Sequence, residues 1–162
     1  MKNGRMFQDF HPIHCADSNF IAANEDMFNG DPATDVIHLS EYGSIIFFII
    51  INANAGSGAA TITVESCDTA VPGTGTAIAF KYWSCTTPDV WSDMATATTA
   101  GFSASGSDNM YAIEVSADGL SGTDEFVRLQ CTETQSDAVD GAITCIAGRG
   151  RYVHEVQGTA LV

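Results

Sequence analysis

Seven large hydrophobic residues in succession, IIFFIII at residues 45–51, constrain this chain more than any other feature of its sequence. A membrane-spanning helix needs about 20 predominantly apolar residues, so this run is too short to cross a bilayer. Turn-forming residues close it on both sides, EYGS before it and NANAGSG after it. The run therefore predicts a central strand covered on both faces, one by a second sheet and the other by the N-terminal residues or a neighbouring subunit.

From about residue 34 onward, short apolar stretches alternate with turn residues. In ATITVESC, Ile62 and Val64 alternate with threonine and glutamate, which is typical of a strand with one wet face. The pattern predicts an all-β chain: a single-domain β-sandwich or jelly roll of seven or eight strands at residues 34–162, preceded by an extended N-terminal arm at residues 1–33. The predicted core consists of Ile45, Phe47, Ile49, Ile62, Val64, Ile78, Phe80, Ile113, Val115, Val127 and Leu129.

The net charge narrows the classes of partner, and the cysteines indicate the redox compartment. The chain has six basic and 20 acidic residues and therefore a net charge of −14, which is the wrong sign for binding nucleic acid or an anionic membrane surface. The first residues have no continuous apolar core of the kind that a signal peptide carries. The five cysteines form an odd set without a CxxC pair, so we expect reduced, buried thiols in a cytoplasm.

No pattern in the sequence indicates catalysis or metal binding. HPIHC brings His11, His14 and Cys15 together, but a structural zinc site needs four ligands and no second pair follows. The chain contains neither the GxSxG of a hydrolase nor a phosphate-binding loop. We therefore expect a protein that is not an enzyme and that uses no metal and no cofactor.

Two tryptophans suggest carbohydrate binding as an alternative function. Trp83 and Trp91, together with Tyr82, could stack against sugar rings on the surface of a β-sandwich. The competing interpretation is that one of the tryptophans packs in the core.

The order of several segments resembles a group of small virion proteins of tailed bacteriophages. AATITVESCD is followed by a Pro-Gly-Thr turn into TAIAFKYW, and then by ATATTAGF, MYAIEVSADGLSGTDEFVRLQCTE and DGAITCIAGRGRY. Over residues 34–155 the chain is similar to head decoration, or cement, proteins. The resemblance implies a sandwich or jelly roll that binds the outside of the capsid and bridges major capsid protein subunits, after assembly in the host cytoplasm. It also implies a homo-oligomer, with a trimer favoured because it matches threefold capsid geometry.

Residues 1–33 differ from the rest because their large apolar side chains follow no strand period. We expect the segment up to about Phe28 to contact the capsid or an adjacent copy. Its predicted contact residues are Lys2, Arg5, Phe7, Phe10 and Phe20. The alternative is an arm that packs on its own domain.

The central strand gives the first testable prediction. Replacing Ile49 with aspartate would bury a carboxylate in the core without a partner, so we expect the variant to yield no soluble protein. Soluble expression at the level of the wild type would contradict the assignment of Ile49 to the core.

Overall fold

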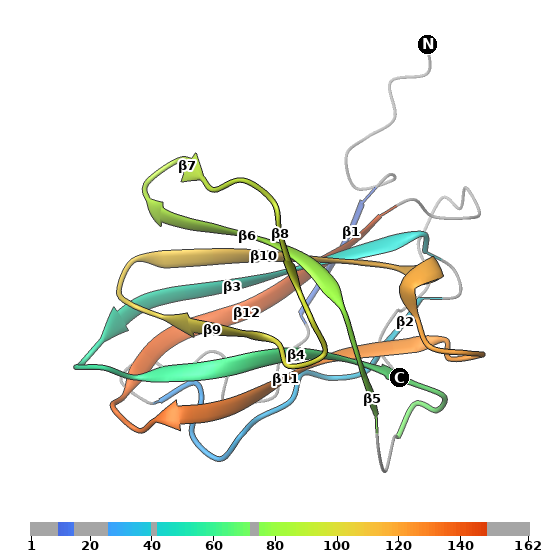
Figure 1. The fold of residues 1–162 in the computed structure, drawn as a ribbon, viewed down its shortest axis with the longest axis horizontal. Helices are drawn as coiled ribbons and strands as arrows, with labels where there is room; N and C mark the ends of the chain where they lie inside the picture. The colour runs from blue at the N-terminus through green and yellow to red at the C-terminus, as the bar shows by residue number, and fades with distance from the viewer. Residues whose placement is uncertain (1–9, 15–25, 40–41, 72–74, 149–162) are drawn as a thin grey trace.

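The computed structural model describes residues 10–14, 26–39, 42–71 and 75–148. These residues form two antiparallel sheets packed as a sandwich, and no α-helix occurs among them. Figure 1 shows the long strands running side by side, with β6, β10 and β3 above β4 and β11. The predicted all-β sandwich is thereby confirmed.

The larger sheet, sheet A, has seven strands in the order β1-β12-β3-β10-β6-β7, and β8 also pairs with β6. Its strands are β1 (Phe10–Ile13), β3 (Ser44–Asn54), β6 (Phe80–Thr87), β7 (Val90–Trp91), β8 (Ala95–Ala97), β10 (Asn109–Ser116) and β12 (Val139–Gly148).

The smaller sheet, sheet B, has five strands in the order β2-β11-β4-β5, and β9 also pairs with β4. Its strands are β2 (Ile37–His38), β4 (Ala59–Cys67), β5 (Thr76–Ile78), β9 (Phe102–Ser105) and β11 (Phe126–Gln135). A short 3-10 helix, Ala117–Gly119, lies in the connection from β10 in sheet A to β11 in sheet B.

The described residues form twelve strands, so the predicted number of seven or eight is wrong. Six strands are eight residues or longer, namely β3, β4, β6, β10, β11 and β12. The other six have two to four residues. Strands of that length are too short to show an alternating pattern, which needs four to eight residues to be recognised.

The core lies between the sheets and is built on β3. Ile45, Phe47, Ile49 and Ile51 alternate along this strand and are 0 to 1% exposed. Strands β12 and β10 flank β3 on either side, so the IIFFIII run is central in its sheet as predicted. All eleven residues of the predicted core are buried.

Residues before position 34 also belong to the core. β1 pairs with β12 in sheet A, and Ile13 on β1 is buried. Met27 and Phe28 are almost fully buried, and the Met27 amide donates to the Val139 carbonyl at 2.9 Å. A Cβ at Gly141 would overlap both the Ile50 carbonyl and the Met27 sulfur, so glycine is what allows this close approach. The boundary at residue 33 stays a prediction, but the sandwich uses side chains from both sides of it.

Four of the cysteines, Cys67, Cys85, Cys131 and Cys145, are buried thiols. Burial, together with the nearby Asp31 carboxylate, raises the pKa of Cys131 to about 12. A thiol with such a pKa is almost never the reactive thiolate, so Cys131 acts as a small core side chain. Cys15 lies outside the described residues.

The burial of Phe28 leads to a prediction. Replacing Phe28 with alanine should lower the free energy of unfolding by about 3–5 kcal/mol, because the truncation leaves a cavity in the core. Phe10→Ala is the matched control, since Phe10 is 46% exposed and loses little burial. Urea unfolding of both variants measures the difference. Equal losses would show that Phe28 is not packed as the structure places it.

Candidate interaction surface

The strand pairings place every second residue of the IIFFIII run, three in all, on the outer face of sheet A. Strand residues alternate between faces, so Ile46, Phe48 and Ile50 point away from the core that their neighbours enter. Ile46 and Phe48 are partly buried and Ile50 is 40% exposed. The prediction of a strand covered on both faces is therefore met on the core side, whereas the outer side is partly open.

Cross-strand neighbours of these three residues extend the surface into rows that cross the sheet. Directly paired residues share a face, and each row joins such pairs from strand to strand. We call this surface the apolar face. Its first row is Pro12, Ile146, Ile46, Glu114 and Lys81; its second is Thr144, Phe48, Ala112 and Trp83; its third is Ala142, Ile50, Met110, Cys85 and Trp91.

Charge is nearly absent from the apolar face. Within the three rows, Glu114 and Lys81 are the charged residues, and they are direct cross-strand partners. Within the described part of the chain, neither side chain forms a hydrogen bond or an ion pair. Their net charge is zero, although the whole chain carries −14.

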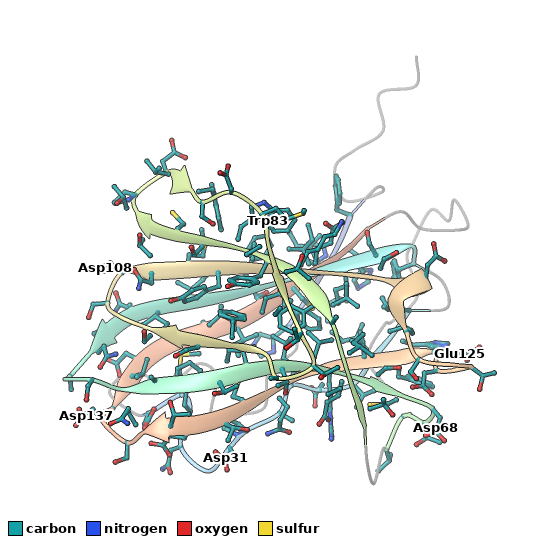
Figure 2. All side chains as sticks on the ribbon, in the orientation of Figure 1. Asp31, Asp68, Trp83, Asp108, Glu125 and Asp137 are labelled. Atoms are coloured by element: carbon teal, nitrogen blue, oxygen red, sulfur yellow. The ribbon has the colours of Figure 1, made fainter. Side chains whose placement is uncertain are left out.

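Many of the acidic residues lie where strands end. Figure 2 shows Asp108 and Asp137 at one end of the sandwich and Asp68 and Glu125 at the other. Asp108 precedes β10, Glu125 precedes β11, Asp68 follows β4 and Asp137 follows β11. The rows of the apolar face are thus set apart from much of the negative charge.

The outer face of sheet B has the opposite character. Its central pairs are Thr61 with Thr132, Thr63 with Gln130 and Glu65 with Arg128. The last pair forms an ion pair at 2.7 Å. One sandwich therefore presents one polar and one apolar outer face. Because an ordinary solvated sheet face resembles that of sheet B, the apolar face calls for a specific explanation.

The predicted glycan-binding tryptophans both lie on the apolar face. Trp91 pairs with Cys85, which is two residues along β6 from Trp83, so the two indoles are diagonal neighbours. Trp91 is 40% exposed and Trp83 is partly buried. The sequence suggested both residues but not their adjacency, which depends on the pairing of β6 with β7.

The predicted arm contacts fall mostly outside the described residues. This holds for Lys2, Arg5, Phe7 and Phe20. Phe10 is described: it pairs with Gly148 at the β1 edge of sheet A and is 46% exposed. It lies on the same side of the sheet as Pro12, beside the first row of the apolar face.

No catalytic or metal-binding cluster emerges from the described residues. None of their histidine, cysteine, aspartate and glutamate side chains gather in groups of three or more that could hold a metal. His38 stacks on Phe126 and lies 3.4 Å from Glu125, while the Ser66 hydroxyl donates to the Asp124 carboxylate. Within the same ranges there is no helix that could cross a bilayer.

Comparisons with known proteins identify no relative: the chain matches no family model, no curated protein and no solved structure.

Two carboxylates show how pH acts on this fold. Partial burial and the nearby Asp26 and Asp31 carboxylates raise the pKa of Glu133. The amide and the hydroxyl of Ser57 donate to Asp137 at 2.7 and 3.0 Å and lower the pKa of Asp137. Folding therefore favours the neutral form of Glu133 and the charged form of Asp137.

Opposite effects on thermal stability follow. Glu133 stabilises the folded state at pH values below its unfolded pKa, and this stabilisation is lost as the pH rises through its higher folded pKa. Replacing Glu133 with glutamine should therefore raise Tm at pH 7 and leave Tm almost unchanged near pH 4. Asp137→Asn should lower Tm at pH 7, with a loss that fades as the pH falls through the folded pKa of Asp137. Thermal unfolding of both variants, from pH 7 to below the folded pKa of Asp137, is the measurement. Shifts of the same sign at pH 7 would refute the assignment.

Proposed function

We propose that this protein is a structural component of a bacteriophage virion. It binds the exterior of the capsid and stabilises the shell by bridging major capsid protein subunits. The apolar face carries the proposal of a role in assembly, because a surface with so little charge suits contact with another protein subunit, and the exposed Phe10 beside it is where we place the contact with the shell. The β-sandwich also agrees with the fold that the sequence resemblance implies.

Such a protein needs no catalytic chemistry. A domain that touches two shell subunits adds buried area at their joint, and each Å² of apolar surface removed from water contributes about 25 cal/mol. Many copies bind one shell, and each copy holds two shell subunits at once, so that weak individual contacts together stabilise the shell. Acidic residues at the strand ends would disfavour contact with DNA, which agrees with a place on the outside of the shell.

A decoration protein makes two kinds of contact, with the shell and with its own copies. For the shell we propose the N-terminal residues and the exposed Phe10, which lies at the β1 edge of sheet A. A large aromatic ring at an accessible edge is a suitable anchor for such a contact. For the contact between copies, the resemblance favours a trimer.

The alternative function is glycan binding by a sandwich module of a virion or tail fibre. Its support is the diagonal placement of Trp83 and Trp91 on one face. Indoles in neighbouring positions can stack against successive sugar rings.

Binding to shells tests the proposal. DNA-free capsids of the phage that encodes this chain, prepared without the protein, should co-sediment with the purified wild type. Phe10→Glu should bind about tenfold more weakly because a charge replaces the aromatic anchor. Val71→Glu is the matched control, since Val71 is 88% exposed and lies outside the apolar face.

Two results would count against capsid binding. One is a wild-type protein that stays in the supernatant at every shell concentration. The other is selective binding on a glycan array that is lost in Trp91→Ala, which would support the alternative.

A further inference from the structure

The strand register makes the apolar face complementary to a copy of itself. Consider two copies stacked face to face about a twofold axis that runs parallel to the strands, between β10 and β6. Each β10 then lies over the partner's β6, and each β3 lies over the partner's β7. A twofold contact of this kind repeats every pairing twice and closes at two copies.

Charge is matched in this arrangement. Lys81 of one copy faces Glu114 of the other, and Glu114 faces the other Lys81, because the two residues are register partners within each chain. Neither has an ion-pair partner within its own described chain. A chain with a net charge of −14 repels its copies, so a neutral face with paired signs is where association costs least.

Size is matched as well. Trp83 faces Ala112 of the other copy, because these two residues also pair across β6 and β10. In the third row, Trp91 faces Ile50 of the other copy across the same axis. Each indole therefore meets a smaller side chain, which lets the two faces approach at the distance of about 10 Å usual for packed sheets.

We propose that the partner of the apolar face is a second copy of this chain, in a twofold dimer centred between β10 and β6. The contact needs no capsid and holds whether or not the chain binds one. It leaves β1 and Phe10 outside the overlap, because β1 is the far edge strand beyond β12. It also differs from the trimer that the resemblance implies.

The dimer should be weak. Four strands, each about 4.8 Å wide, and three rows, each about 6.8 Å wide, give a footprint of roughly 400 Å² for each copy. A standard stable interface takes about 800 Å² from each partner. We therefore expect a dissociation constant in the micromolar range or above.

Sedimentation equilibrium of the full chain, from about 5 μM to about 1 mM, should show a monomer–dimer equilibrium. Ile50→Lys and Trp91→Lys should each weaken the dimer by about tenfold or more, because each buries two unpaired ammonium groups per dimer. Val71→Lys is the control for added positive charge and should dimerise at least as well as the wild type. Far-UV circular dichroism verifies that each variant is folded.

A charge exchange tests the register directly. Lys81→Glu alone places acids opposite acids, and Glu114→Lys alone places bases opposite bases, so each variant should remain monomeric. An equimolar mixture should recover the dimer, because every contact across the axis then joins opposite charges. A defect confined to one chain would not be repaired by mixing.

Several results would overturn the proposal. A monomer at every concentration would assign the apolar face to another occupant, such as a shell subunit or the chain's own N-terminal residues. A trimeric mass would exclude the twofold contact. A dimer insensitive to Ile50→Lys and Trp91→Lys, or a mixture that stays monomeric, would place the contact elsewhere.

Discussion

The alternation of side chains along β3 is the constraint on which the rest of the structure depends. Seven consecutive hydrophobic residues in a strand cannot all enter one core, because successive side chains point to opposite faces. Ile45, Phe47 and Ile49 fill the sandwich, and the same geometry commits Ile46, Phe48 and Ile50 to the outside. Core and apolar face are therefore two products of one strand, and a one-residue slip of register would exchange them.

The sequence predicted the parts of the fold that rest on local pattern. The class, the central position of β3 and all eleven predicted core residues could be read from alternation and flanking turns. The six shortest strands could not, since their two to four residues are held by pairing with longer neighbours. Met27 and Phe28 were assigned to the arm because no strand period surrounds them, although both are buried in the core.

The surface was harder to predict than the core. Trp83 and Trp91 were recognised as candidate binding residues, but only the pairing of β6 with β7 shows that they are neighbours. The rows of the apolar face combine β1, β3, β6, β7, β10 and β12, which are scattered along the chain. A single strand such as β10 carries a methionine, an alanine and a glutamate on its outer side, and this pattern alone does not predict a surface built from several strands.

The position of β3 in the chain has a consequence for its synthesis. β3 is complete at Asn54, whereas its two partner strands end at Ser116 and Gly148. At translation rates of about 5–20 residues per second, this isoleucine-rich strand is exposed for several seconds before the first of its two partner strands has been synthesised. Such a segment, with high β-propensity and no charge, is the kind that nucleates aggregates. The nascent chain should therefore depend on chaperone capture during this interval, and its yield should depend on the speed of translation between β3 and β10.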